Sequence, residues 1–374
     1  MDVTQAQGPV SEGLAGIVAG TTKISSVGEK ELGLTYRGYD IGDLSRHASF
    51  EEVAFLLIEG RLPTPQEFAA FRGELAVARA WPAPIAGSLE QIPAVASAMD
   101  VLRTGASMLG CLDPEPGPGS AVRLLGALPA VLTYWWAFHH AGLRLPWDAD
   151  DAPTADYLIA RLPGTGNTDE VRRTLDMSLI LYAEHEFNAS TFVVRVAAST
   201  LTDLYSAVTA AIGTLKGSLH GGANEAALAM ISRFRDELEV DEGITGMLGS
   251  GTLVPGFGHR IYRSGDPRSP IIKEMAGRLA AAHPDDPFLA IAEEIEATLA
   301  TRKRLFPNLD LYSAVAYHYC GIAPTLATPL FVLSRTSGWL AHFAEQQSDN
   351  RLIRPNASYS GPRLQHFVPL GERI

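Results

Sequence analysis

The sequence predicts an all-α protein with two domains, on three observations. Apolar residues recur at the three- and four-residue spacing of an amphipathic helix through most of the chain. Strand-like stretches are confined to a short region near the N-terminus. The chain has 374 residues, which is long for a single core, and 46% of them are hydrophobic, which is enough for two. We therefore expect a large helical domain, a smaller helical domain and a small β element.

The predicted helices follow one another along the chain. The first runs from Phe50 to Ile58 and stops at Gly60, a residue that favours a helix C-terminus. Asp203 is a plausible N-cap for a later helix, and Asn224 begins the next one with an acidic first turn that suits the helix dipole. The other segments with helical spacing are 99–109, 124–138, 175–182, 201–215, 224–238, 270–282 and 288–304.

The predicted strands lie at 17–26 and 31–40, where β-branched residues are punctuated by glycines, as in a hairpin or meander. The segments 113–119 and 163–168 are rich in proline and glycine and are expected to be surface loops. Neither has the composition of a linker between domains.

Composition excludes several classes of function. The formal net charge is −12 and the isoelectric point is near 5.3, so we expect neither nucleic acid nor an anionic membrane as a partner. An anionic substrate would need a local group of arginines. Cys111 and Cys320 are too few for a disulfide framework and lack the spacing of a zinc site, which favours a reducing cytoplasm and no metal.

Two segments bear on membrane targeting. Residues 1–10 have neither the basic nor the apolar stretch of a signal peptide. The uncharged run 124–138 is interrupted by Pro129 and is shorter than the ~18 apolar residues that a spanning helix needs. We expect it to be a buried core helix.

His220 lies in the segment Ser218-Leu219-His220-Gly221-Gly222, just before a predicted helix. The positive end of a helix dipole disfavours a charged imidazole, and a neutral ring can donate a hydrogen bond to a developing enolate. The alternative is a turn histidine without a chemical role.

His259 closes the loop Val254-Pro255-Gly256-Phe257-Gly258. The two glycines let backbone groups approach a ligand closely, so the loop can bind an adenine or a thioester arm through its main chain. Its spacing is not that of a phosphate-binding loop, and Gly-x-Gly turns without function are common.

Asp310 follows Pro307-Asn308 and precedes the apolar segment 311–319. Its simplest role is the N-cap of that helix. Its functional role would be that of a general base on a C–H acid, which requires burial to raise its pKa toward neutrality.

Three arginines lie beside chain breakers: Arg268, Arg335 and Arg354. A guanidinium binds a carboxylate through two parallel hydrogen bonds, so a dicarboxylate substrate would call for such residues. Taken individually, each is by default a surface arginine.

His185 lies in the polar segment 182–191. A zinc protease would need a second histidine four places later, where Ala189 stands, so that metal site is excluded. A polar group that ends in Asn188 can instead hold a keto acid.

Taken together, these segments resemble the citrate synthase family from about Gly13 to the C-terminus. The resemblance is carried by three motifs in order: Lys216-Gly217-Ser218-Leu219-His220-Gly221-Gly222-Ala223-Asn224-Glu225, then Gly256-Phe257-Gly258-His259-Arg260-Ile261-Tyr262 with Asp266-Pro267-Arg268, then Pro307-Asn308-Leu309-Asp310.

The resemblance implies a role for each residue singled out above. It implies that Asp310 removes the α-proton of an acyl-CoA, that His220 hydrogen-bonds the enolate, and that His259 gives a proton to the carbonyl oxygen of oxaloacetate. The oxaloacetate-binding residues that it implies are His185, Asn188, Arg268, Arg335 and Arg354. The coenzyme A-binding residues that it implies are Leu253, Val254, Pro255, Gly256, Phe257 and Gly258, with Lys303 or Arg304 at the phosphates.

The finer expectation is a 2-methylcitrate synthase, which condenses propionyl-CoA with oxaloacetate. The segments 182–188, 99–105 and 306–310 look more like that branch, and many citrate-specific members carry histidine in place of Tyr182. One methylene supplies only about 1–3 kcal/mol of discrimination, so acetyl-CoA should also react. The alternatives are citrate synthase proper and a non-catalytic helical regulator with the same fold.

Two departures from the family pattern concern loop geometry and substrate preference. Ser97-Ala98 stands where the family often has His-Pro, and Ser218 stands where proline is frequent. Neither carries an implied proton-transfer role.

The resemblance also implies an organisation. Residues 1–220 with 322–374 would form the large domain, and residues 221–321 a small, mobile, coenzyme A-binding domain. The protein would be a homodimer in which Arg354 reaches the partner's site. No cofactor is implied, because the coenzyme A thioester is a substrate.

Overall fold

Helices dominate the computed structural model, which describes residues 12–14, 16–29, 33–117 and 119–373. The α-helices are α1 (Ile41–His47), α2 (Phe50–Glu59), α3 (Pro65–Ala80), α4 (Ala86–Gln91), α5 (Ala98–Leu112), α6 (Ser120–Ala141), α7 (Thr154–Arg161), α8 (Asp169–Tyr182), α9 (Ala189–Ser199), α10 (Leu204–Leu215), α11 (Ala223–Ile231), α12 (Val240–Gly249), α13 (Ser269–Ala280), α14 (Phe288–Lys303), α15 (Leu309–Tyr319) and α16 (Ala327–Ser348). The 3-10 helices are η1 (Glu12–Leu14), η2 (Ala83–Ile85), η3 (Glu237–Glu239), η4 (Pro324–Leu326) and η5 (Leu370–Glu372). The prediction of an all-α fold with a small β element is confirmed.

Local capping explains where several helices begin and end. Ser49 and Thr64 start α2 and α3 with capping boxes, in which the glutamate three residues later bonds back to the cap. Asp203 caps α10 as predicted, so that helix begins at Leu204 and not at Leu201. Gly60 ends α2 in a left-handed conformation, with φ of 80°.

The β element is a three-stranded antiparallel meander of β1 (Ser25–Glu29), β2 (Gly33–Tyr36) and β3 (Tyr39–Asp40). β1 begins only at Ser25, so the strand predicted from Ile17 is mostly wrong. The predicted residues 31 and 32 lie outside the described residues. Tyr36 of β2 and Ile24, which immediately precedes β1, are fully inaccessible to solvent.

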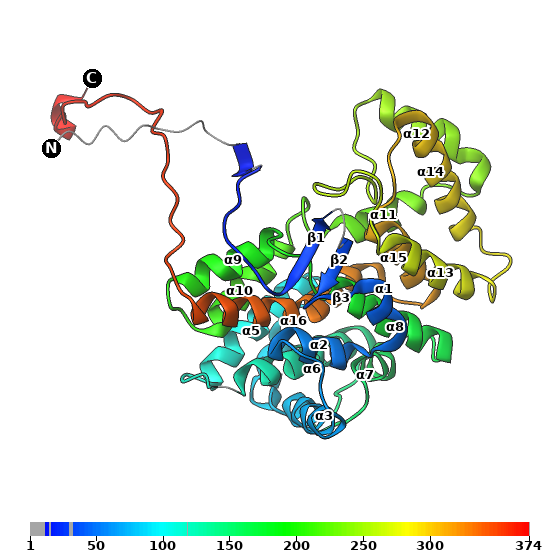
Figure 1. Ribbon diagram of the computed structural model, residues 1–374, viewed down its shortest axis with the longest axis horizontal. Helices are drawn as coiled ribbons and strands as arrows, with labels where there is room; N and C mark the ends of the chain where they lie inside the picture. Colours follow the sequence, from blue (N-terminus) through cyan, green and yellow to red (C-terminus); the bar gives the residue numbers. More distant parts are fainter. Residues whose placement is uncertain (1–11, 15, 30–32, 118, 374) are drawn as a thin grey trace.

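Two long helices form the centre of the larger group of helices. α6 packs against α3 and α5, and α16 packs against α2, α8, α9 and α10 (Figure 1). Their Trp135 and Trp339 are fully buried. α6 is long and apolar enough to cross a membrane by length and composition, but 72% of its most apolar 18-residue stretch is buried inside the protein. The prediction of a buried core helix is therefore confirmed.

Pro129 does not interrupt α6, contrary to the sequence-based expectation. The helix continues through it for 22 residues. Proline has no backbone N–H, so one hydrogen bond of the helix is lost, but a helix that is packed on most sides can tolerate this loss. Thr133 also donates a hydrogen bond from Oγ1 to the carbonyl oxygen of Pro129 at 2.9 Å.

A second group of helices lies beside the first. Figure 1 shows α11, α12, α13 and α14 gathered at the upper right, with α15 between them and the remaining helices. α13 and α11 pack against α15, and α12 packs against α14. α11 ends at Ile231, so the helix predicted to reach Leu238 is too long. The assignment of residues 221–321 to a separate domain stays a prediction.

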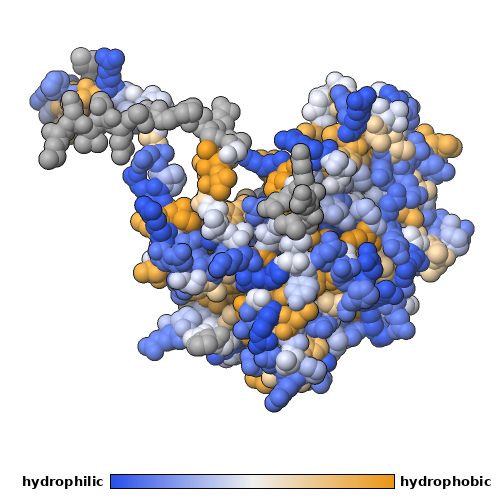
Figure 2. Space-filling model, in the orientation of Figure 1, coloured by the Kyte–Doolittle hydropathy of each residue, from blue (hydrophilic) through white to orange (hydrophobic). Residues whose placement is uncertain are grey.

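After α16 the chain leaves the helices as an extended segment from Asp349 to Arg373, which ends in the short 3-10 helix η5. Figures 1 and 2 show it projecting from the body of the molecule. Most of its apolar side chains are exposed, among them Tyr359 at 78% and Phe367 at 83%. Arg354, which the sequence placed at a partner's site, lies in this segment and bonds Asn356 at 2.7 Å.

Candidate active site

His185 lies in the loop between α8 and α9 and is buried. Its Nε2 is 3.3 Å from the hydroxyl of Tyr262, and its ring centroid is 5.1 Å from that of His259. Burial, together with the nearby charge of Arg268, lowers the pKa of His185 well below its usual value. The ring is therefore neutral at physiological pH.

His220 follows α10, and its ring faces the N-terminus of α9. Its Nε2 accepts a hydrogen bond from the backbone N–H of Ser190 at 3.2 Å, so in the neutral ring the proton is on Nδ1. Burial and Arg335 lower the pKa of His220 to about 4. The sequence suggested that the N-terminus of the following helix, α11, acts on this ring. In the structure it is the N-terminus of α9 that contacts it.

His259 has the opposite tautomer. Its Nδ1 accepts hydrogen bonds from the backbone N–H groups of Ile261 and Tyr262 at 3.1 and 3.2 Å, so Nε2 carries the proton of the neutral ring. Burial and Arg268 lower the pKa of His259 to about 4. Each of the two imidazoles therefore has one N–H group to donate.

Asp310 is in the first turn of α15 but is not its N-cap. Asn308 fills that position, and its Oδ1 accepts from the Asp310 N–H at 3.0 Å, so the capping role predicted for Asp310 is wrong. The freed carboxylate accepts a hydrogen bond at 2.7 Å from the hydroxyl of Tyr182. Burial raises the pKa of Asp310, against the lowering effect of Tyr182 and Arg268.

Two of the three predicted arginines are buried beside these groups. Arg268 makes a bidentate ion pair with Asp266, whose exposed fraction is 2%. Arg335, 1% exposed, donates from Nε to the carbonyl oxygen of Tyr182 at 2.7 Å. In the part of the chain that the structure describes, its other guanidinium nitrogens have no hydrogen-bond partner. Arg335 can therefore receive an anionic ligand at a desolvated position.

The contacts join the predicted residues into one cluster. Phe331 packs its ring against Tyr182, with centroids 4.5 Å apart, and His220 meets the same ring at 6.1 Å. Arg335 lies over it, 4.7 Å from the centroid. The charges of Arg268 and Arg335 both act on Asp310. The arrangement combines a carboxyl with a raised pKa, two imidazole N–H donors and two buried cations, which suits proton removal from carbon and the binding of an anion.

The glycine loop 253–258 lies next to this cluster. Gly256 and Gly258 both have positive φ, at 82° and 76°, which explains the residue type at each. The loop is bonded to the start of α15, since Asn308 donates its N–H to the carbonyl oxygen of Gly256 at 2.9 Å and its Nδ2 to that of Gly258 at 3.1 Å.

The other residues predicted to bind coenzyme A differ in exposure. Leu253 is 81% exposed, whereas Val254 is buried. Lys303 ends α14, and Arg304 is its C-cap with φ of 53°; both are exposed.

Asn188 has a structural role that accounts for its side chain. It is the N-cap of α9, with Oδ1 accepting from the Thr191 N–H at 3.2 Å. It also accepts from the Ser190 hydroxyl at 2.9 Å, which places it one contact away from His220.

Sequence reasoning missed the supporting residues of the cluster. Tyr182 bonds Asp310, Asn224 bonds Tyr182, Asp266 pairs with Arg268, and Ser190 bonds His220. The first three stand inside the motifs quoted above, and Asp266 could have been identified because an acidic residue two places before an arginine is a natural ion-pair partner. Ser190 had no such signal, because its contact joins the first turn of α9 to His220, which is 30 residues further along the chain.

Among the residues that the structure describes, no group of three or more His, Cys, Asp or Glu side chains has an arrangement that could hold a metal ion.

Comparison with known proteins gives one family. Residues 13–356 match the family described as "Citrate synthase, C-terminal domain". The chain is 47% identical to the 2-methylcitrate synthase of Shewanella oneidensis, over 96% of this chain and 97% of that protein. It superposes on citrate synthase from Thermotoga maritima with a TM-score of 0.87 and 33% identity, over 98% of this chain and 100% of that one.

A third similar structure contains ligands. It is citrate synthase from Thermoplasma acidophilum in a ternary complex with carboxymethyl coenzyme A and oxaloacetate, with a TM-score of 0.86, 30% identity, and coverage of 98% and 100%. The match of fold, sequence and motifs over nearly the whole length shows that this chain is an enzyme of the citrate synthase family.

Proposed function

We propose that this enzyme condenses oxaloacetate with propionyl-CoA and water to give 2-methylcitrate and coenzyme A. The observation that carries the proposal is that one cluster contains both Asp310, whose pKa is raised, and two neutral imidazoles. Backbone contacts define which nitrogen of each ring carries the N–H. The membership of the family supports the same reaction class, and the relative from Shewanella oneidensis supports the choice of acyl group.

In the first step, the Asp310 carboxylate removes a proton from the α-carbon of the acyl group. The electron pair moves to the thioester oxygen, which becomes an enolate. The Nδ1–H of His220 donates a hydrogen bond to that oxygen, and donors that are in place beforehand stabilise such charge strongly.

In the second step, the enolate carbon attacks the keto carbon of oxaloacetate and forms the new carbon–carbon bond. The keto oxygen gains a proton from Nε2 of His259 and becomes a hydroxyl group. Water then cleaves the thioester, with its oxygen retained in the new carboxylate and coenzyme A leaving as the thiol.

We assign the oxaloacetate carboxylates to Arg268 and Arg335, with His185 on the keto acid and Asn188 as a weaker contact. The buried, desolvated guanidinium of Arg335 supports this assignment. We further infer a homodimer in the cytoplasm, in which Arg354 of the exposed C-terminal segment reaches the partner's site.

Coenzyme A itself would lie along the glycine loop, from Leu253 to Gly258, with its phosphates at Lys303 or Arg304. The exposure of both cations and the positive φ of both glycines support that placement. No other cofactor is needed for these steps.

Acetyl-CoA is the second candidate substrate. The structural relatives named above are citrate synthases, and a pocket that accepts one more methylene rejects the shorter acyl group by only about 1–3 kcal/mol. We therefore expect turnover with both thioesters and a higher kcat/KM with propionyl-CoA.

The test is thiol release from each acyl-CoA in the presence of oxaloacetate. Asp310→Asn should lower kcat by about 10² to 10⁴ while oxaloacetate still binds, because it removes the base and keeps the shape. Asp285→Asn, at an exposed turn, is the matched control and should retain wild-type kcat. Absence of thiol release from the wild-type enzyme with either acyl-CoA would favour the non-catalytic alternative, and full activity in Asp310→Asn would remove Asp310 from the mechanism.

A further inference from the structure

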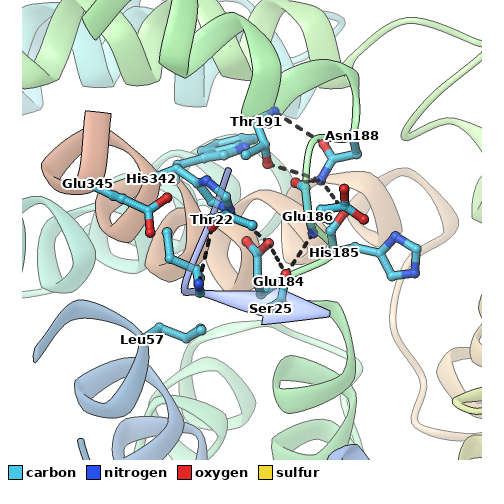
Figure 3. A network of polar contacts seen from close by, with 12 residues as sticks. Thr22, Ser25, Leu57, Glu184, His185, Glu186, Asn188, Thr191, His342 and Glu345 are labelled. Carbon is cyan, nitrogen blue, oxygen red and sulfur yellow. Dashed lines mark hydrogen bonds and ion pairs between the residues drawn. The ribbon is translucent and has the colours of Figure 1, made fainter. Parts of the chain in front are cut away.

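Glu184 precedes His185 in the chain, and its carboxylate is completely buried. Its Oε1 accepts hydrogen bonds from the hydroxyl of Ser25 at 3.0 Å and from Nε2 of His342 at 2.9 Å (Figure 3). Its Oε2 is buried against α16 without a hydrogen-bond partner in the described part of the chain, at a place where only the missing side chain of Gly338 leaves room. A buried carboxylate in a protein costs free energy unless it is paired, so its retention calls for an explanation.

The hydrogen bonds to Glu184 have a fixed direction. Arg195 can only donate, and its Nη1 lies 3.0 Å from Nδ1 of His342. Nδ1 of His342 therefore accepts a hydrogen bond from Arg195, and the Nε2–H of His342 donates one to Glu184. Arg195 in turn pairs with Glu345 at 2.7 Å.

The charge of Glu184 is maintained by its neighbours. Burial acts to raise the pKa of Glu184, but His342, Arg335 and Ser25 outweigh it and the pKa is lowered. Arg335 has no ion pair among the described residues, and Glu184 is the strongest favourable charge that acts on it. The carboxylate is thus the counter-charge of a guanidinium that we assign to oxaloacetate.

The β-sheet holds the backbone on both sides of His185. Ser25 of β1 accepts from the N–H of Glu186 at 3.0 Å with the same hydroxyl that donates to Glu184. Tyr36 of β2 donates to the Glu184 carbonyl oxygen at 3.0 Å. Figure 3 shows the Glu184 carboxylate facing Ser25 while the His185 ring points in another direction.

We propose that Glu184 is a positioning residue for oxaloacetate: held by His342 and Ser25, its buried carboxylate fixes the loop that carries His185 and balances the charge of Arg335. This inference rests on the proposed function, because it assumes that His185 and Arg335 bind the keto diacid. Glu184 itself does not touch the substrate.

The test compares Glu184→Gln with a matched control. The glutamine keeps the size of the side chain and removes its charge. We expect the KM for oxaloacetate, and its Kd measured by calorimetry without acyl-CoA, to rise on the order of 10- to 100-fold, since hydrogen bonds to charged groups have effects of this size. The kcat at saturating oxaloacetate and the KM for acyl-CoA should change by less than about threefold.

Glu51→Gln is the control, because Glu51 is equally buried, at 2% exposure, and accepts a backbone hydrogen bond from Thr154 at 2.6 Å in another part of the molecule. It should leave both KM values unchanged. Equal rises in both KM values for Glu184→Gln, or unchanged or tighter oxaloacetate binding, would overturn the proposal.

Variants of Ser25 keep the proposal testable if Glu184→Gln does not fold. Ser25→Ala should raise the KM for oxaloacetate in the same selective manner, and Ser25→Thr, which retains the hydroxyl group, should restore it. Failure of Ser25→Ala to alter that KM, or failure of threonine to restore it, would count against the positioning role. If wild-type protein neither binds oxaloacetate nor releases thiol, the proposed function fails; if it does both while these variants match it, only the inference fails.

Discussion

The basicity of Asp310 depends on one phenol. Asn224 donates from Nδ2 to the hydroxyl of Tyr182 at 3.2 Å, which directs the phenolic hydrogen toward Asp310 Oδ1, 2.7 Å away. That hydrogen bond stabilises the carboxylate and opposes the rise in pKa that burial causes. Tyr182 therefore limits how far burial raises the pKa of Asp310.

Replacing Tyr182 by phenylalanine should move the acid limb of the pH profile to higher pH. Loss of the hydrogen bond leaves burial less opposed, so the pKa of Asp310 rises further and the base is protonated at a higher pH. Because a hydrogen bond to a charged group contributes about 1.5–3 kcal/mol, kcat/KM should fall on the order of tenfold more at acid than at alkaline pH. Tyr134→Phe, which loses a similar contact to Glu90 at 2.7 Å, is the control. An unshifted profile in Tyr182→Phe would show that Asp310 is not the titrating base.

Carboxylates of one helix cap the N-termini of others in the larger group of helices. Asp176 of α8 accepts from the N–H of Phe50 at the start of α2, at 3.1 Å. Glu51 of α2 accepts from the N–H of Thr154 at the start of α7, which has no side-chain cap of its own. Burial, with Glu51 nearby, raises the pKa of Asp176 to about 7. The junction of these helices therefore titrates near neutrality.

Asp176→Asn should raise the free energy of unfolding, relative to that of the wild type, more at pH 8 than at pH 5. A pKa raised from 3.8 to about 7 on folding contributes stability that is complete below pH 3.8 and is lost as the pH rises through 7. Asparagine keeps an acceptor for the Phe50 N–H and carries no charge, so it avoids this loss, which has a ceiling of about 4 kcal/mol. Urea unfolding of both proteins at the two pH values measures it. A difference between variant and wild type that does not depend on pH would contradict the raised pKa.

Elements with strong local signals were predictable from the sequence. The Asp203 cap and the Gly60 stop were found because a single side chain or its absence decides them. α16 was missed because it is buried on nearly all sides, and its hydroxyl-bearing residues Ser334, Thr336 and Ser337 break the apolar stripe. Those hydroxyls bond to main-chain carbonyl groups, for example Thr336 to Val332 at 2.7 Å, which only the folded helix reveals.

The candidate site was predictable residue by residue but not as a geometry. His220 and His259 stand beside glycines, and such positions are visible in a sequence. The tautomer of each ring depends on which backbone N–H groups it meets, and those of Ser190, Ile261 and Tyr262 are placed by tertiary structure or by the local turn. Asn308 and Asp310 can both cap a helix, and the sequence does not show which of them caps α15; in the structure it is Asn308.

At the scale of the whole molecule, the site draws on both groups of helices. His185 and Arg335 belong to the larger group, and Arg268 and His259 belong to residues 221–321. The predicted boundaries between the two groups fall at Gly221 and Gly321, where an added Cβ would overlap the carbonyl oxygens of Leu215 and Gly164. The backbones are therefore closely packed at both crossings, and glycine is required there. A ligand held by arginines from both sides would draw the groups together.

Oxaloacetate alone should therefore order residues on the smaller group. We expect it to slow amide hydrogen exchange in 253–262 and 306–310 as well as in 183–190, because closure around a dianion excludes water from the loops that complete the acyl-CoA site. Arg335→Leu, which removes one anchor from the larger group, should abolish the protection on both sides. Protection confined to 183–190 would mean that the two groups do not move together, and that the coenzyme A loop is formed before the first substrate arrives.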